Sequence, residues 1–343
     1  MTPISFSFPT QEVQCYLNQP FRRLSEITAP ADSVIITDYH VYRHHHEAMA
    51  GYPVIKIPAG EAHKTQQSVD YIIEELLKLE AGKDTWLVAV GGGVITDIAG
   101  LVSVLYKRGT KLALVPTSLL AMVDAAIGGK NGINTGVYKN IVGTIRQPSF
   151  IWYDFELLRT LPAEEWVNGM AEVIKHACIQ DELLFRMLEQ YNMHDIQTDL
   201  SLVETLVERN IRIKMNIVTA DEAEAGDRKL LNFGHTIGHA IENLHHIPHG
   251  HAISMGMVAI CNLAVRLNIL EVQEAVRIVK LLAKYHLPVD LETDLQQVYQ
   301  AIRQDKKRQS DLIQLVLLKK IGEAFVYPLP VDSMQEHLKH IMA

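Results

Sequence analysis

The feature that most constrains the fold is an apolar segment that runs directly into three glycines. Residues 85–93 read TWLVAVGGG, and the following VITDIAGLVSVLYKRG has helical spacing and ends at Gly109. Other short apolar runs lie at residues 33–37, 53–58, 111–116 and 150–154, with a helical pattern at 66–82. Strands that alternate with helices predict a parallel sheet covered by helices on both faces. The first half of the chain is therefore predicted to be an α/β domain.

The second half changes to helical patterning. Apolar residues recur three and four apart over residues 161–191, 201–218 and 274–286. Near the end, LIQLVLL and EAFVYPL flank KKIG and predict a small hairpin. We therefore predict an α/β domain over residues 1–157 and a mostly helical domain over residues 158–343.

Composition excludes several classes of protein. The formal net charge of −8 and the pI near 6.0 disfavour a nucleic-acid binder that depends on bulk positive charge. The three cysteines (Cys15, Cys178 and Cys261) are far apart, match no ligand spacing and favour free thiols in a reducing cytosol. The N-terminus carries no signal-peptide pattern, and no apolar run approaches the ~20 residues that span a bilayer. We expect a cytoplasmic chain that binds neither nucleic acid nor membrane.

The glycines after the 85–90 strand indicate either a phosphate or nucleotide site or a purely structural tight turn. Glycine lets backbone approach a phosphate, and the N-terminus of a helix favours anions. The pattern matches neither the dinucleotide fingerprint nor a P-loop, so both readings stay open. Asp38, Glu61 and Lys64 follow other early strands, where cofactor loops of α/β sheets lie, although such loop charges are often only solvated.

Basic residues gather near glycines and near Glu172 and the histidines of residues 231–257. Lys130 and Lys139 lie in VDAAIGGKNGINTGVYKN, which we read as a long glycine-rich loop of functional character. Together, these basic residues predict a pocket for a molecule with several negative charges. The other members of the set are Arg108, Lys175, Lys214, Arg228, Lys306 and Lys307.

Residues 231–257 contain a cluster of histidines. His235 and His239 are four apart in a helical segment and share a face, while His249 follows in a predicted turn. An open catalytic metal site needs a third protein ligand, and Glu172 in the earlier helical segment GMAEVIKHA is the candidate. His239 is then left as an acid or base, and His245 and His246 are predicted to lie on the surface.

Taken together, the motifs resemble the 3-dehydroquinate synthase family. The matching strings include GGGVITDIAG, VPTSLLAMVDAAIGGKNGIN, LPAEEWVNGMAEVIKHA, DRKLLNFGHTIGHAIE and PHGHAISMGM, in the order of the family. The resemblance extends from about residue 35 to residue 325, and the joint match is far more specific than any one string.

The resemblance implies a Rossmann-like NAD-binding α/β domain, a mostly α-helical metal- and substrate-binding domain, and an active site between them. The implied substrate is a small sugar-acid phosphate, 3-deoxy-D-arabino-heptulosonate 7-phosphate, which a carbon–oxygen lyase converts to 3-dehydroquinate and phosphate. The implied steps are oxidation by NAD, phosphate elimination, reduction, ring opening and aldol closure, so NAD is not consumed. The implied metal is one divalent ion, zinc or cobalt. The Arg108 position of the family reaches the neighbouring subunit's site, which implies a homodimer.

The resemblance also assigns roles residue by residue. Its metal ligands are Glu172, His235 and His249. Its cofactor-binding positions are Asp38, Glu61, Lys64, Gly92, Gly93, Asp97, Thr117, Ser118, Lys130, Lys139, Leu157, Leu158, Arg159 and Thr160. Its catalytic positions are Arg108, Asp124, Lys130, Asn140, Lys175 and His239. Its other substrate-binding positions are Lys214, Arg228, Asn232, Lys306 and Lys307.

Four positions depart from the commonest family pattern. Ala59 stands where Asp is frequent, Thr96 where Gly is frequent, and Asn131 where Thr is usual. His251 stands where an acid is frequent and adds a second imidazole close to His249. Either of these two histidines is thus a possible metal ligand, and we favour His249.

Two other enzyme classes and one class without catalysis remain as alternatives. Another sugar-phosphate cyclase shares the metal and NAD residues, but Lys214 and Arg228 favour a substrate with a carboxylate. A metal-dependent NAD polyol dehydrogenase has a related two-domain plan but does not need the basic set. A metal- or nucleotide-binding scaffold would show no turnover.

Overall fold

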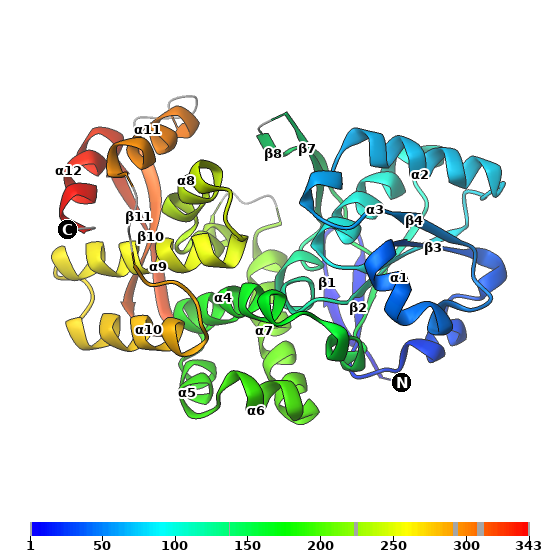
Figure 1. Ribbon diagram of the computed structural model, residues 1–343, viewed down its shortest axis with the longest axis horizontal. Helices are drawn as coiled ribbons and strands as arrows, with labels where there is room; N and C mark the ends of the chain where they lie inside the picture. Colours follow the sequence, from blue (N-terminus) through cyan, green and yellow to red (C-terminus); the bar gives the residue numbers. More distant parts are fainter. Residues whose placement is uncertain (1, 137, 223–225, 291–293, 307–311, 342–343) are drawn as a thin grey trace. The chain divides into compact units, whose positions relative to one another are not determined.

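The computed structural model describes residues 2–136, 138–222, 226–290, 294–306 and 312–341 (Figure 1). By the contacts between its residues, the chain divides into two compact units. Unit 1 consists of Met1–Trp166 with Val203–Met215, and unit 2 consists of Val167–Leu202 with Asn216–Ala343. The functional boundary at 157/158 stays a prediction.

Unit 1 is built on a seven-stranded sheet with the order β1-β2-β9-β6-β5-β3-β4. Only β1 and β2 pair antiparallel, and the neighbouring pairs from β2 to β4 are parallel. The predicted parallel α/β fold is therefore confirmed. The strands are β1 (Ile4–Ser7), β2 (Glu12–Tyr16), β3 (Ser33–Asp38), β4 (Val54–Ile57), β5 (Trp86–Gly91), β6 (Lys111–Pro116) and β9 (Phe150–Trp152).

The sheet forms here because its central strands are continuous apolar runs. Every residue of β3 is buried, and so is every residue of β5 after Trp86. Burial on both faces is the pattern of a parallel sheet that helices cover on both sides. Val88, Val90, Val115 and Trp152 belong to one core cluster, against which Val41 and Tyr42 pack.

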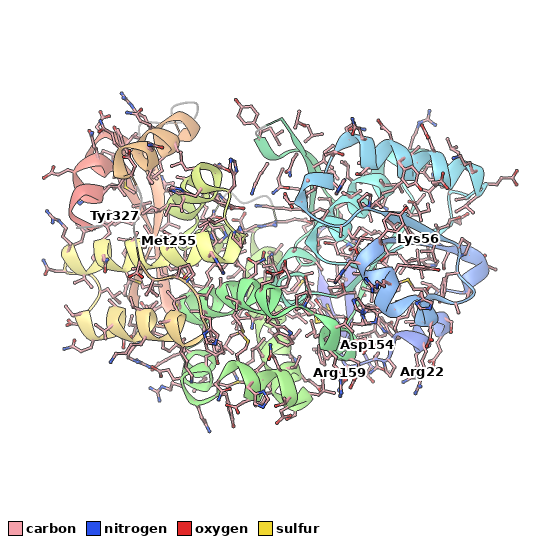
Figure 2. All side chains as sticks on the ribbon, in the orientation of Figure 1. Arg22, Lys56, Asp154, Arg159, Met255 and Tyr327 are labelled. Carbon is pink, nitrogen blue, oxygen red and sulfur yellow. The ribbon has the colours of Figure 1, made fainter. Side chains whose placement is uncertain are left out.

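The helices of unit 1 connect successive strands. α3 packs on β5 and β6, while α1 packs on β3 and β4, and Figure 1 shows α1, α2 and α3 around the sheet. Asp154, labelled in Figure 2, ends the last strand segment by accepting hydrogen bonds from the backbone N–H groups of Phe21 (2.7 Å) and Glu156 (3.1 Å). The helical segments of this unit are α1 (Tyr39–His45), α2 (Gln66–Lys78), α3 (Gly93–Leu105), the π-helical turn η6 (Ala121–Ala125), the middle of α7 (Leu200–Ala220), and the 3₁₀ segments η1 (Phe21–Glu26), η2 (Pro30–Asp32), η3 (His46–Met49), η4 (Glu61–His63), η5 (Tyr106–Arg108) and η7 (Phe155–Thr160).

The segment that the sequence indicated as a long glycine-rich loop is mostly an antiparallel hairpin. β7 (Lys130–Thr135) pairs with β8 (Tyr138–Ile145), and α3 packs against β7. The prediction of a loop was wrong because glycines there serve close packing. A Cβ on Gly132 of β7 would lie 2.9 Å from the carbonyl oxygen of Val142 on β8, and Gly100 of α3 likewise leaves room for the side chain of Asn131. The hairpin β1–β2 was also not predicted.

Unit 2 is mostly helical, as predicted. Its helices are α4 (Ala163–Gln180, from Val167 onward), α5 (Glu182–Gln190), α6 (Met193–Thr198), the ends of α7, η8 (Asp227–Asn232), α8 (His235–His245), α9 (His249–Arg266), α10 (Val272–Lys284), α11 (Leu295–Lys306) and α12 (Val331–Ile341). α9 is the central helix and packs against α8, α10 and α12, with Met255 buried along it (Figures 1 and 2). The predicted hairpin is present as β10 (Leu312–Lys320) and β11 (Glu323–Pro330). Among the described helices, none has the length and apolar character to cross a bilayer.

Helices α8 and α9 approach closely because glycines face each other where they cross. Gly234 precedes α8 in the left-handed region (φ 79°), which glycine adopts without strain. A Cβ on Gly256 of α9 would overlap the carbonyl oxygen of Gly234. His249 is the first residue of α9, so the predicted turn around it was wrong.

We predict that Gly256→Ala lowers the free energy of unfolding by about 1–3 kcal/mol. The added methyl group would collide with the backbone of Gly234, and a change of side-chain rotamer cannot remove a collision with backbone. Gly82→Ala is the matched control: the nearest atom to its added Cβ is Thr85 Oγ1 at 3.8 Å. That control should change stability by no more than about 0.5 kcal/mol. Urea denaturation followed by circular dichroism measures both. Equal effects of the two substitutions would contradict the close helix crossing.

Candidate active site

The centre of the candidate site in unit 2 is the buried carboxylate of Glu172 on α4. Its Oε1 atom lies 3.2 Å from His249 Nε2 and 3.5 Å from His235 Nε2. The three helices α4, α8 and α9 thus each supply one side chain to the same point. The sequence predicted this trio, and the structure brings it together.

The backbone next to His235 fixes the state of its ring. His235 Nδ1 lies 3.1 Å from the carbonyl oxygen of Phe233. A carbonyl only accepts, so Nδ1 donates its proton there and the lone pair on Nε2 faces Glu172. Burial and the ammonium of Lys175 hold the pKa of His235 well below its ordinary value. His235 is therefore a neutral imidazole with an exposed lone pair, the form that binds metals.

A second carboxylate orients His249. Glu242 on α8 is buried, and its Oε2 atom lies 3.2 Å from His249 Nδ1. Burial alone would lower the pKa of His249, but hydrogen bonds to Glu172 and Glu242 raise it to about 9. Carboxylates commonly orient metal-binding histidines in this way. Sequence analysis missed Glu242, although its spacing of seven from His235 places it on the same helix face.

The charge of Glu172 is stabilised by Lys175, one turn along α4. The Lys175 ammonium forms an ion pair with Glu172 Oε2, and both side chains are buried. Burial by itself would raise the pKa of Glu172, but the charge of Lys175 and the hydrogen bond from His249 hold it well below its ordinary value. Glu172 is thus an ionised carboxylate at neutral pH, and Lys175 is fixed beside it.

These donors fit a divalent metal. The ligand atoms of Glu172, His235 and His249 all lie within 4.8 Å of one another. One carboxylate and two imidazoles leave an open position on zinc, as catalytic zinc sites require. His239 is exposed, forms a further possible group with Glu242 and His249, and has its ring centroid 5.1 Å from that of His235. His251 belongs to none of the ligand groups found among the described residues.

In unit 1, three of the predicted residues meet: Lys64, Asp97 and Asn140. The buried ammonium of Lys64 lies 2.5 Å from Asp97 Oδ2 and donates to Asn140 Oδ1 at 2.6 Å. Burial raises the pKa of Asp97 to about 6, although Lys64 opposes this shift. Glu61 lies in the neighbouring segment and accepts a hydrogen bond from Asn134 (2.7 Å). The cluster joins the segment after β4, helix α3 and strand β8.

A second pair in unit 1 joins Lys214 of α7 to Asp124 of the π-helical turn. Lys214 Nζ lies 2.8 Å from Asp124 Oδ1 and donates to the Asp124 carbonyl at 2.6 Å. Lys214 is buried, so its ammonium has a fixed position. The structure brings these two predicted residues together, although they are distant in sequence.

The glycines at the end of β5 are closely packed against the segment after β6. A Cβ on Gly93 would lie 3.2 Å from the side chain of Ala125, and one on Gly92 would lie 3.4 Å from Ser118 Oγ. The N–H of Thr117 donates to the Gly91 carbonyl at 3.0 Å. Four predicted cofactor residues, Gly92, Gly93, Thr117 and Ser118, thus surround the N-terminus of α3. The glycines have a packing reason of their own, and an N-terminus of this kind also suits a phosphate.

The other predicted residues of unit 1 are distributed over several helices, strands and turns. Asp38 caps α1 by accepting from Val41 N (2.8 Å), and Arg108 is exposed with φ 60°. Arg159, labelled in Figure 2, is exposed and pairs with Glu156, while the Thr160 hydroxyl lies 2.8 Å from His45 Nε2. Leu157 and Leu158 are buried, and Lys130 and Lys139 are exposed on the hairpin.

In unit 2, Arg228 is buried and donates to the Glu222 carbonyl at 2.7 Å, and Asn232 is half-buried at the end of η8. His245 and His246 are exposed, as predicted. The side chain of Lys306 and all of Lys307 lie outside the described residues.

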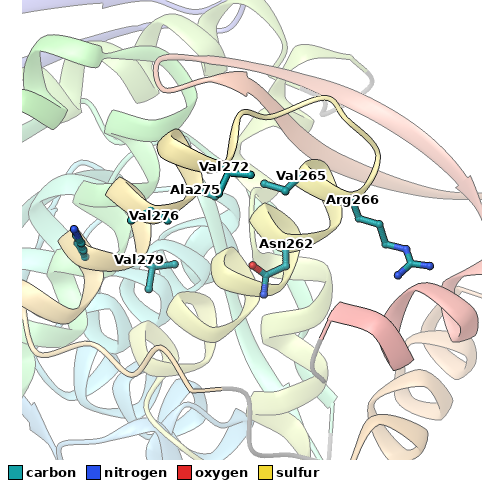
Figure 3. Close-up of a pocket in the computed structure, with 8 residues that line it drawn as sticks. Asn262, Val265, Arg266, Val272, Ala275, Val276 and Val279 are labelled. Atoms are coloured by element: carbon teal, nitrogen blue, oxygen red, sulfur yellow. The ribbon is translucent and has the colours of Figure 1, made fainter.

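A cavity of about 460 Å³ between α9 and α10 is separate from these groups (Figure 3). Val265, Val272, Val276 and Val279 contribute apolar walls, with Arg266 at its rim. Of the described residues that line it, none is an acid, a histidine or a cysteine. It has no chemistry of the kind found around Glu172.

We predict that Asp97 titrates near pH 6 and that Lys64→Met moves its pKa higher, because the substitution removes a charge that lowers it. The pKa of Asp97 in the folded protein lies above its ordinary value of 3.8. Asp97 therefore contributes to the stability of the fold below pH 3.8, and this contribution is lost as the pH rises through about 6. Carboxyl ¹³C NMR with labelled Asp measures the pKa. Lys78→Met, which removes an exposed lysine, is the control and should leave it unchanged. An Asp97 that titrates near 4 would contradict the buried pairing.

Comparison with known proteins places these features in a family. Models described as "3-dehydroquinate synthase N-terminal" and "3-dehydroquinate synthase C-terminal" match residues 54–168 and 169–308. A 3-dehydroquinate synthase of Streptococcus pneumoniae (strain JJA) is 38% identical over 327 residues, covering 92% of each chain.

Solved structures share the fold. A 2-deoxy-scyllo-inosose synthase in complex with carbaglucose-6-phosphate, NAD⁺ and Co²⁺ superposes with a TM-score of 0.87 at 24% identity, covering 98% of this chain and 99% of that one. A 2-epi-5-epi-valiolone synthase from Streptomyces hygroscopicus subsp. jinggangensis 5008, with NAD⁺ and Zn²⁺ bound, gives 0.85 at 26% identity, covering 99% and 98%. The family predicted from the motifs is confirmed: the chain belongs to the 3-dehydroquinate synthase family, whose members are lyases.

Proposed function

We propose that this chain converts 3-deoxy-D-arabino-heptulosonate 7-phosphate into 3-dehydroquinate and phosphate, with catalytic NAD and one divalent metal ion, zinc or cobalt. The observation that carries the proposal is the convergence of Glu172, His235 and His249 in a chain of this family. Their identity and spacing match the metal ligands that the motifs imply. The cyclase relatives solved with NAD⁺ and with Co²⁺ or Zn²⁺ support the same cofactors.

The proposed domains are an NAD-binding domain over residues 1–157 and a metal- and substrate-binding domain over 158–343. Bound NAD supplies a reversible hydride acceptor, and the bound metal supplies a Lewis acid for substrate hydroxyls. Glu172, His235 and His249 hold the metal. The residues that hold NAD are Asp38, Glu61, Lys64, Gly92, Gly93, Asp97, Thr117, Ser118, Lys130, Lys139, Leu157, Leu158, Arg159 and Thr160.

Substrate charges meet the basic residues. Lys130, Asn140, His239 and one or both of Lys306 and Lys307 bind the phosphate in this proposal, and Lys214 and Arg228 bind the carboxylate. Asp124 fixes Lys214, while the Glu222 carbonyl helps fix Arg228, so both cations are held in place before substrate arrives. Asn232 adds a polar contact to substrate.

Proton transfer falls to His239, and charge stabilisation to the lysines. His239 is exposed beside the metal ligands, which suits a group that exchanges protons with substrate. Lys175 is held by Glu172 and, together with Lys130, stabilises negative charge as it develops on substrate oxygens. The family resemblance also supports a homodimer, with Arg108 contributed to the neighbouring site, and a cytoplasmic location.

The test of the proposal is phosphate release from the heptulosonate phosphate in the presence of NAD and zinc, with the product identified by mass spectrometry and NMR. We expect 3-dehydroquinate and no net NADH absorbance at 340 nm. Net NADH would indicate a polyol dehydrogenase, and turnover of a substrate without a carboxylate would indicate another sugar-phosphate cyclase. Full activity after thorough metal removal would exclude the metal role.

We predict that His249→Ala loses bound metal and that His251→Ala, the matched control two residues away, retains it. The reason is that His249 contacts Glu172, whereas His251 belongs to no ligand group among the described residues. Metal content of the purified variants, measured by mass spectrometry, decides between them. The reverse result would assign the ligand to His251.

We also predict that zinc binding at pH 7 releases about one proton per metal ion. The pKa of His249 is about 9, so this ring must lose a proton to bind metal, while low pKa values leave His235 neutral and Glu172 ionised beforehand. The released proton should disappear as the pH rises above about 9. Calorimetry in buffers with different ionisation enthalpies measures it. Release of no proton at pH 7 would contradict the charge state assigned to His249.

A further inference from the structure

The hairpin of unit 1 contains an irregularity at Asn134. The pairing register of its two strands shifts between Ile133 and Thr135. Within this gap β7 has the single residue Asn134, whereas β8 has three residues, 139–141. Such irregularities interrupt the ladder of backbone hydrogen bonds and commonly redirect side chains next to functional sites. Asn134 was not among the residues that the sequence indicated.

The side chain of Asn134 joins two segments that are far apart in the sequence. Its Nδ2 group donates to Glu61 Oε1 at 2.7 Å, and its Oδ1 atom accepts from the backbone N–H of Asn140 at 2.9 Å. An ionised carboxylate only accepts and an N–H only donates, so the partners fix which end of the amide faces which segment. The backbone N–H of Asn134 also donates to the Lys64 carbonyl at 2.8 Å. One residue thus contacts both ends of segment 61–64 and the backbone of Asn140.

Lys64 completes the group of contacts. Its ammonium donates to Asn140 Oδ1 at 2.6 Å and lies 2.5 Å from Asp97 Oδ2. Asn140 is therefore held at its backbone N–H by Asn134 and at its side chain by Lys64. Its backbone lies in the left-handed region (φ 53°), which asparagine adopts more readily than most residues. The two contacts define this conformation.

We propose that Asn134 is a positioning residue that keeps segment 61–64 and Asn140 in one arrangement, so that NAD and the sugar phosphate each bind better when the other is present. The inference rests on the proposed function, in which Glu61 and Lys64 hold NAD and Asn140 binds the substrate phosphate. A ligand that orders one of these segments also orders the other through Asn134. Coupling of this kind is reciprocal by thermodynamic linkage.

An amide of this length suits both side-chain partners of Asn134. An aspartate would lack the donor and would place a second carboxylate against Glu61, while a leucine has a similar shape but neither donates nor accepts. A residue that only braced the hairpin would affect the stability of the fold without changing ligand affinities. The positioning role and a purely structural role are therefore separable by experiment.

The first test is Asn134→Leu, which removes both side-chain hydrogen bonds and retains the backbone N–H that donates to Lys64. We expect the Kd for NAD and the KM for the heptulosonate phosphate each to rise about three- to tenfold, the effect of one or two modest hydrogen bonds. The kcat should change by less than about twofold, because no group proposed to bind metal or to transfer protons is removed. Calorimetry measures NAD binding, and phosphate release measures turnover.

The second measurement tests the coupling itself. In the wild-type protein, excess inorganic phosphate should lower the Kd for NAD by about threefold or more, and Asn134→Leu should abolish most of this effect. Potassium chloride at the same ionic strength is the reference. A wild-type NAD affinity that does not respond to phosphate would overturn the coupling.

An exchange of hydrogen-bonding partners tests the contact with Glu61. Asn134→Asp should raise the Kd for NAD more in the wild-type background than in a Glu61→Gln background, because the glutamine amide donates to the new carboxylate. Equal effects in the two backgrounds would show that the two side chains do not interact, and would overturn the role of this contact.

Gln19→Leu is the matched control. The half-buried amide of Gln19 also donates once, to the Leu17 carbonyl at 2.9 Å, and accepts once, from Arg23 at 3.0 Å. None of these three residues is assigned to NAD or to substrate, so the Kd for NAD and the KM should stay within about twofold of wild type. Circular dichroism confirms that both leucine variants are folded and compares their stability. A shift in ligand affinity as large in Gln19→Leu as in Asn134→Leu would overturn the positioning role.

Failure of this inference and failure of the proposed function give different results. Wild-type NAD affinity and KM in Asn134→Leu, in a protein that converts the heptulosonate phosphate, would overturn the positioning role alone. A wild-type protein whose NAD affinity responds to phosphate and to Asn134→Leu, but which forms no 3-dehydroquinate, would overturn the proposed reaction alone.

Discussion

The site in unit 2 depends on one buried negative charge. Glu172 is ionised inside the protein, and an ionised carboxylate there is stable only if cations and donors surround it. Lys175 supplies the fixed positive charge, and protonated His249 donates to the remaining oxygen, which the lone pair of His235 also faces. The positions of three helices are therefore linked through one carboxylate, and a divalent cation is the ligand that this arrangement favours.

Charges in unit 1 are organised by the same principle. Lys64 is buried between Asp97 and Asn140, and Lys214 is buried against Asp124. Each lysine loses freedom of its long side chain and gains a fixed position for its ammonium group. For an enzyme that handles a substrate with a phosphate and a carboxylate, cations held in advance reduce the reorganisation needed when the substrate binds.

Much of the fold and of the site was predictable. The parallel sheet followed from buried apolar runs, and Glu172, His235 and His249 followed from ligand chemistry and from the resemblance. The hairpin β7–β8 was missed because its glycines resemble those of a loop, whereas Gly132 and Gly143 permit close contact between its two strands. Glu242 was missed because an acidic residue on a helix is usually at the surface, and only packing shows that it faces His249.

The sequence by itself determined the family, the alternation of strands and helices, and the residue types available for chemistry, because these depend on local pattern and on joint motif matches. Tertiary structure alone decided which charges meet. Lys64 and Asn140 are 76 residues apart in the sequence, and Lys214 and Asp124 are 90 apart. Their protonation and pairing depend on burial and on distances of about 3 Å, which arise only when separate elements pack together.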